Sequence, residues 1–208
     1  MSSEPSLEGA SKKLLEALAI VTNEYSSPYH ARLAKNIPSK EFLKISAVFL
    51  RVAIKLKEFQ TFWFDSYKKG KDAFTQNIDI ELIESGKLDM VLFKKIIHRS
   101  SRGEDFLRAL KRIRFYAVDF LQKSINQKSK ATGTAEDFLG MLIDPLIVTV
   151  EGDLIRLKGR IERCNLYFQN KLNRQMFLLA IVSVLASITA LAIALVPHIQ
   201  SLIQQLMQ

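Results

Sequence analysis

The side chains in this sequence with the clearest chemical potential are basic, and they gather between positions 94 and 114. Eight basic residues against two acidic ones, Glu104 and Asp105, leave +6 of the total net charge of +9 in this window. Such a cluster favours an anionic partner, either a lipid surface or the phosphates of a nucleic acid. The eight residues are Lys94, Lys95, Arg99, Arg102, Arg108, Lys111, Arg112 and Arg114.

Residue types that serve catalysis and metal binding are sparse. The histidines are His30, His98 and His198. They lie far apart without a cysteine partner, so no zinc site is predicted. The sequence lacks the GxxxxGK[ST], GxGxxG and GxSxG motifs that cradle phosphates or present a nucleophilic serine. We therefore predict that the protein is not an enzyme and needs no metal or cofactor.

Residues 177–196, FLLAIVSVLASITALAIALV, are twenty consecutive residues without charge, Pro or Gly. As a helix they would be about 30 Å long, which is the hydrocarbon thickness of a bilayer. Five basic residues lie in 158–174 and none follows the segment, so the positive-inside rule predicts a cytosolic 1–176. Residues 197–208 are then a short tail, either lying at the far interface or extending the helix beyond a kink at Pro197.

The chain starts Met1-Ser2-Ser3-Glu4 without a basic n-region, and its apolar stretch from Leu14 to Val21 is interrupted by Glu16, so we expect no cleaved signal peptide. Together with the C-terminal apolar segment, this predicts a tail-anchored, single-pass membrane protein. An anchor beside a basic cluster favours anionic lipid over nucleic acid as the anionic partner.

The rest of the sequence predicts an all-α fold, with a helical bundle over residues 1–133. Apolar residues recur at intervals of three and four in helices expected over 39–69 and 104–127, as in coiled coils. A further helix is expected over 7–25, with weaker ones over 28–35 and, in two pieces, 72–97. The two strong seams are Phe42, Ile45, Phe49, Val52, Leu56, Phe59 and Trp63, and Phe106, Leu110, Ile113, Ala117 and Phe120.

Residues 134–176 admit two interpretations. The stretch LIVTVEGDLIRLKG has the β-branched residues and the central turn of a β-hairpin. The three-and-four spacing of its apolar residues favours a helix instead, starting at a capping box of Thr134 and Asp137. We expect a stalk helix that continues into the membrane. The helical seam is Ile147, Val150, Leu154, Leu157, Ile161, Cys164 and Phe168.

Small residues recur at helical spacing within the apolar segment. Such residues let membrane helices approach closely and associate. Self-association of the span is therefore one interpretation, and ordinary alanine usage is the other. The residues are Ser183, Ala186, Ser187, Ala190 and Ala194.

A charged stalk that ends in Asn173-Arg174 and enters the span at Met176 resembles CorA-type divalent-cation channels over residues 145–196. The Gly-Met-Asn motif and the second span of that family are missing, so the resemblance does not imply transport. The heptad helix with a C-terminal anchor also resembles a SNARE, without the polar residue of its central layer.

The sequence thus favours a non-enzymatic interaction or scaffold module at the membrane surface. We expect it to assemble into a homo-oligomer or to bind a helical protein partner. An oligomeric pore or membrane-disrupting subunit is the first alternative. A membrane-tethered nucleic-acid-binding protein is the second.

Overall fold

The computed structural model describes residues 7–26, 37, 39–68, 74 and 90–206, and all its regular elements are helical. The predicted all-α fold is confirmed. The predicted helix at 28–35 and the predicted helical stretch at 72–89, apart from Phe74, lie outside the described residues. The elements are α1 (Leu7–Val21), the π-helical turn η1 (Thr22–Ser26), α3 (Ser39–Lys68), α5 (Met90–Asn126), α6 (Thr132–Asp137), the π-helical η3 (Phe138–Ile143) and α7 (Asp144–Leu206).

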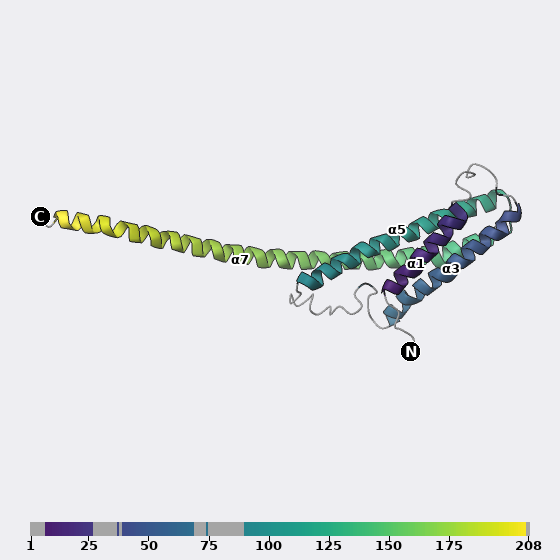
Figure 1. The fold of residues 1–208 in the computed structure, drawn as a ribbon, viewed down its shortest axis with the longest axis horizontal. Helices are drawn as coiled ribbons and strands as arrows, with labels where there is room; N and C mark the ends of the chain where they lie inside the picture. The colour runs from purple at the N-terminus through teal and green to yellow at the C-terminus, as the bar shows by residue number, and fades with distance from the viewer. Residues whose placement is uncertain (1–6, 27–36, 38, 69–73, 75–89, 207–208) are drawn as a thin grey trace. The chain divides into compact units, whose positions relative to one another are not determined.

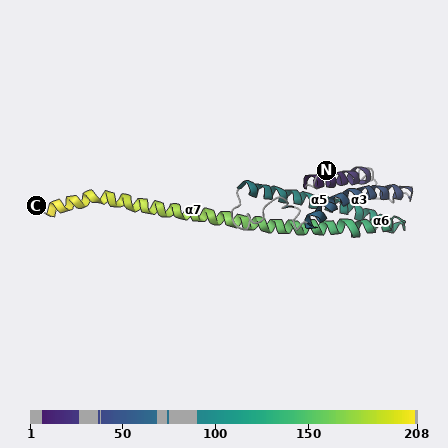
Figure 2. The ribbon, with the colours of Figure 1, turned by 90° about the horizontal axis from the view of Figure 1, so that it is seen from below.

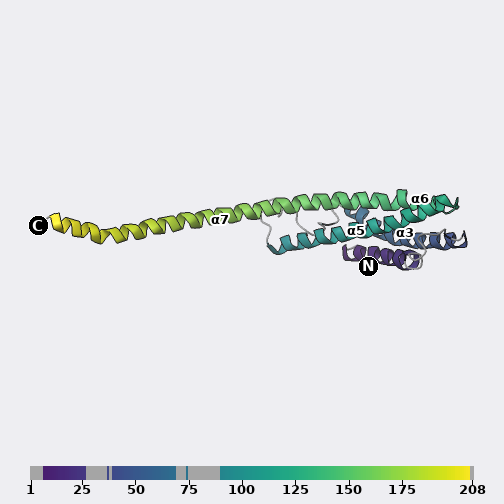
Figure 3. The same cartoon turned by 90° about the horizontal axis from the view of Figure 1, so that it is seen from above.

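The chain divides into two compact units, Met1–Ile161 and Glu162–Gln208. In the first unit, α1 lies on one side of α3 and α5, and α6 with the beginning of α7 lies on the other (Figures 1, 2 and 3). Ion pairs fasten α1 to α3, with 2.7 Å between Lys13 and Glu58 and 3.0 Å between Lys55 and Glu16. By the division into units, residues 134–161 belong to the first unit, together with the bundle.

Two groups of aromatic rings fill the interior of this unit. Near one end, Phe49 of α3 stacks on Phe120 of α5 at 5.2 Å between centroids. Near the other, Trp63 of α3 lies 5.5 Å from Phe74 and 6.1 Å from Phe106 of α5. All residues of the two predicted seams of α3 and α5 are buried, so these seams are confirmed as core.

Residues 146–158 are helical, as part of α7, and the β-hairpin interpretation is wrong. The physical reason is visible in the burial pattern. Leu146, Val150, Leu154 and Leu157 are all buried, whereas Val148 and Ile155 are 69% and 65% exposed. Apolar residues thus pack inward at the spacing of a helix, not at the two-residue period of a strand.

Asp153 is a buried carboxylate in the same stretch, with none of its surface exposed. The indole Nε1 of Trp63 donates to its Oδ2 at 2.7 Å, and Arg156 donates to its Oδ1 at 2.6 Å. A buried charge is tolerated only when it is hydrogen-bonded in this way. The pair joins α3 to α7 inside the core.

Two predicted helix starts are wrong. The helix expected from residue 104 begins at Met90 and runs through Gly103. A Cβ on Gly103 would lie 2.7 Å from Phe74 Cζ and 2.9 Å from Leu154 Cδ1, so this glycine admits close packing rather than ending a helix.

The capping box at Thr134 is also absent. Helix α6 begins at Thr132, after Ala131 and without a side-chain cap. Ser129 starts the turn instead, because its Oγ accepts from the Ala131 N–H at 3.2 Å and its carbonyl accepts from the Thr132 hydroxyl at 2.8 Å.

The second unit is the continuation of α7 from residue 162. The helix passes through Pro197 and continues to Leu206. Its ribbon changes direction within its yellow, C-terminal part (Figure 2), as expected where a proline removes a helix hydrogen bond.

Candidate functional site

Residues capable of nucleophilic or metal chemistry do not gather in the described part of the chain. No group of three or more His, Cys, Asp or Glu side chains lies there in a position to hold a metal ion. His98 is exposed on α5, Cys164 is buried and His30 lies outside the described residues. The candidate sites are therefore surfaces: the basic residues of α5, the groove beside them and the apolar segment of α7.

Helix α5 carries all eight basic residues of the predicted anionic-surface site, but the structure divides them. Lys111 pairs with Glu151 at 3.2 Å, and Arg114 pairs with Asp144 at 2.7 Å. Both acids belong to α7, so these two ion pairs join α5 to α7. This contribution of α7 could not be counted from the window 94–114.

Arg99 also has a structural partner. Its guanidinium donates to the carbonyl oxygen of Phe74 at 2.8 Å. Burial lowers the pKa of Arg99, and the neighbouring Arg102 lowers it further. This arginine therefore holds the chain at Phe74 against α5, and it is only partly exposed to solvent.

Lys94 and Lys95 are exposed near the start of α5. Neither makes an ion pair within the described residues. They form a small basic site of their own, separated along the helix from the arginines that follow.

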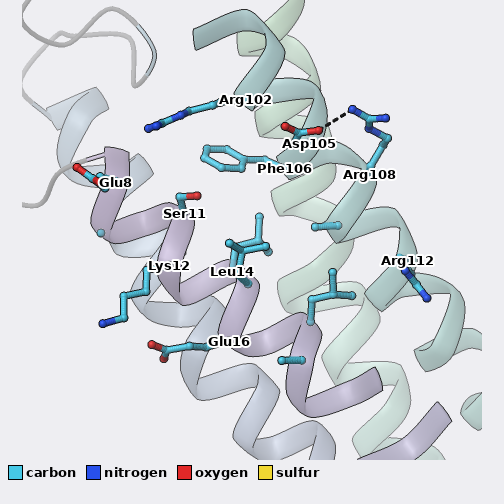
Figure 4. Close-up of a pocket in the computed structure, with 15 residues that line it drawn as sticks. Glu8, Ser11, Lys12, Leu14, Glu16, Arg102, Asp105, Phe106, Arg108 and Arg112 are labelled. Carbon is cyan, nitrogen blue, oxygen red and sulfur yellow. Dashed lines mark hydrogen bonds and ion pairs between the residues drawn. The ribbon is translucent and has the colours of Figure 1, made fainter. Parts of the chain in front are cut away.

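The remaining arginines, Arg102, Arg108 and Arg112, line a groove of about 980 Å³ between α1 and α5. Figure 4 shows Arg102 reaching over the Phe106 ring toward α1. Arg108 is paired with Asp105 at 2.5 Å and is still 74% exposed. These three side chains form the basic rim of the groove.

Arg112 is further fixed by Tyr116. Burial by itself would raise the pKa of Tyr116. Its hydrogen bonds with Ser26 and Arg112, together with the positive charge of Arg112, have the larger effect, and the pKa of Tyr116 is lowered. The link ties the end of the rim to the segment that follows α1.

Helix α1 supplies an apolar floor and the opposite rim of the groove. Leu15 is 59% exposed there, beside Leu18 and Ala19. Glu8, Lys12 and Glu16 make the rim on this side (Figure 4). Hydrogen bonding to Lys55 lowers the pKa of Glu16, so its charge is already engaged with α3.

Sequence reasoning missed this groove because it assigned α1 only a core face. The available signal was the pair Leu14-Leu15. Adjacent positions on a helix lie about 100° apart, so both cannot point into one narrow core face. Leu14 is 1% exposed, whereas Leu15 faces the groove.

The described chain contains one helix that is long and apolar enough to cross a membrane. All residues of 177–196 are exposed. The hydroxyls of Ser187 and Thr189 donate to the carbonyls of Ser183 and Leu185 at 2.9 and 2.8 Å, so this apolar surface carries few free polar groups. The predicted self-association residues Ser183, Ala186, Ser187, Ala190 and Ala194 all lie on it.

Comparison with protein-family models, curated proteins and solved structures finds no match for this chain. What the protein does must therefore follow from its own residues.

Proposed function

We propose that this chain is a membrane-anchored, non-enzymatic interaction protein. The observation that supports it best is the segment Phe177–Val196, which is apolar and exposed on every face. A soluble monomer rarely exposes so large a contiguous apolar surface, because water orders around it at a free-energy cost. A bilayer removes that cost. The bilayer core offers no hydrogen-bond partner to backbone groups, but a continuous helix satisfies these groups internally.

In this proposal the bundle is the part of the chain that binds a partner. Basic residues before the span, such as Lys171 and Arg174, favour the cytosolic side for it. Its groove between α1 and α5 combines an apolar floor at Leu15 with a rim of arginines. This combination suits an amphipathic helix that carries acidic residues beside its apolar face.

The size of the groove agrees with such a ligand. Its lining on α1 extends from Glu8 to Ala19, which is about 16 Å of helix, or three turns. An amphipathic helix of three turns offers two or three apolar anchors at this length. Arg102 and Arg112 would then meet its acidic residues, and the partner class is a protein with an acidic helical segment.

Anchoring is tested by expressing the full chain and extracting membranes with alkaline carbonate. We expect the protein to stay in the membrane pellet. The double variant Leu185→Arg, Ile188→Arg should move to the supernatant, because each arginine costs about 2.5 to 3.5 kcal/mol at the centre of a membrane helix. The control Leu43→Arg changes a residue that is 80% exposed on the bundle and should stay in the pellet. Extraction of the unchanged protein would refute the anchor.

Groove binding is tested with the full chain in neutral-lipid nanodiscs and a labelled, acidic amphipathic peptide. Arg102→Glu with Arg112→Glu should weaken binding by about tenfold, since two rim charges are reversed at up to about 1 kcal/mol each. Lys94→Glu with Lys95→Glu should leave peptide binding unchanged. The groove assignment is wrong if the Lys94→Glu, Lys95→Glu variant loses peptide binding and the arginine variant does not. If the lysine variant also loses binding to anionic vesicles, the basic residues contact lipid.

A further inference from the structure

The part of α7 inside the bundle unit has two different apolar faces. One face packs inward through residues such as Val150, Leu154 and Leu157, which are at most 4% exposed. The opposite face points to solvent and is apolar as well, whereas the outer side of a bundle helix is ordinarily polar. We call this side the α7 outer face; it consists of Pro145, Val148, Gly152, Ile155 and Gly159.

The α7 outer face has the spacing of a helix-packing seam. Its members follow one another at intervals of three, four, three and four residues, the heptad pattern of a two-helix contact. Val148 and Ile155 protrude, and a Cβ on Gly152 or Gly159 would meet nothing within 4 Å. Protruding residues thus alternate with open positions at one repeat. In a parallel pair in register, Val148 and Ile155 would pack against their own counterparts, and the glycines would let the two helices approach closely.

The charges beside this face do not oppose contact between identical copies. Asp144 and Glu151 on one flank are paired with Arg114 and Lys111 of α5. Arg156 on the other flank is paired with the buried Asp153 at 2.6 Å. A flank of balanced pairs neither repels an identical flank nor selects a strongly charged partner.

Half of this pattern continues along the sequence of α7 at every seventh residue, whereas Glu162 and Gln169 occupy the intervening positions. Asn173, Ala180, Ser187 and Ala194 follow Gly159 by whole multiples of seven residues. A single Asn at such a seam position specifies parallel, two-stranded pairing in register. The last three are small residues within the apolar segment, where close helix contact is favoured.

We propose that two copies of this chain associate in parallel through the α7 outer face. The parallel orientation rests on the membrane anchoring proposed above, because anchors inserted with one orientation hold the copies side by side. Both copies then present their grooves between α1 and α5 on the same side of the membrane. A dimer of this kind binds a partner with two acidic segments more tightly than either groove alone.

The test is cysteine cross-linking of the full chain in native membranes, in a Cys164→Ser background. Val148→Cys and Ile155→Cys should each form a disulfide-linked dimer under mild oxidation, because equal positions meet in a parallel, in-register pair. Lys158→Cys is the matched control, on an exposed α7 residue outside the face, and should stay monomeric. Equal cross-linking at all three positions, or none at 148 and 155, would overturn the proposal.

The second measurement is the mass of the full chain in detergent by light scattering, with twice 23.7 kDa expected. Gly152→Leu with Gly159→Leu should raise the dissociation constant about tenfold or more, because added side chains separate the helices. Gly140→Leu, at another open glycine, should leave the mass unchanged. A carbonate-resistant monomer refutes the dimer alone, whereas carbonate extraction of the unchanged chain refutes the anchor.

Discussion

Replacing Asp153 by alanine tests whether the buried Asp153–Trp63 pair holds α7 in the bundle. Asp153 is fully buried, and the indole of Trp63 donates to it at 2.7 Å. Alanine removes the acceptor and leaves a buried indole N–H without this partner. Arg156, whose side chain is 60% exposed, turns to water at little cost.

The expected loss can be estimated from these contacts. A hydrogen bond to a charged group contributes about 1.5 to 3 kcal/mol, and an orphaned buried donor costs about 1 to 3 kcal/mol. We expect Asp153→Ala to lower the free energy of unfolding by about 3 kcal/mol. In a chain of this size that corresponds to a melting temperature about 6 to 12 °C lower. Asp153→Asn keeps an acceptor oxygen and should lose about 1 kcal/mol.

The assay uses the full chain in detergent and titrates it with guanidinium. Trp63 is the single tryptophan, so its fluorescence reports unfolding of the bundle directly. Circular dichroism follows the Trp63→Phe variants, including the double variant with Asp153→Ala, to complete a double-mutant cycle. Additive losses, or an Asp153→Ala protein within about 0.5 kcal/mol of the unchanged one, would refute the reasoning.

Three further predictions concern packing, protonation and access. Gly103→Val should lower the free energy of unfolding by about 1 to 3 kcal/mol, because its Cβ would lie 2.7 Å from the Phe74 ring; a stability equal to that of Gly140→Ala would contradict this. The pKa values of Glu16 and Glu104 are lowered below their ordinary 4.5 by hydrogen bonds with lysines, so their stabilisation is present above that pH and is lost as pH falls through the folded-state values. Denaturant midpoints should therefore decrease below about pH 4.5, and an increase would contradict the ion pairs. Burial raises the pKa of the Cys164 thiol, so maleimide labelling at neutral pH should be slow in the folded chain and fast in guanidinium, whereas equal rates would mean an accessible thiolate.

The sequence by itself determined the elements that depend on periodicity and on long apolar runs. The seams of α3 and α5 were readable because burial along a helix repeats every three or four residues. The same spacing favoured a helix over a β-hairpin at residues 146–158, and the structure decided between the two. The apolar run 177–196 was equally plain, since the thickness of a bilayer sets a length that few other segments reach.

Only the tertiary structure decided which charges are engaged and where helices approach closely. Lys111 and Arg114 counted as part of a basic face until α7 brought Glu151 and Asp144 to them. Gly103 read as a helix start until Phe74 was placed against it. In each case the deciding partner lies 25 or more residues away in the chain: Coulomb attraction and steric contact depend on distance in space, which local sequence patterns do not contain.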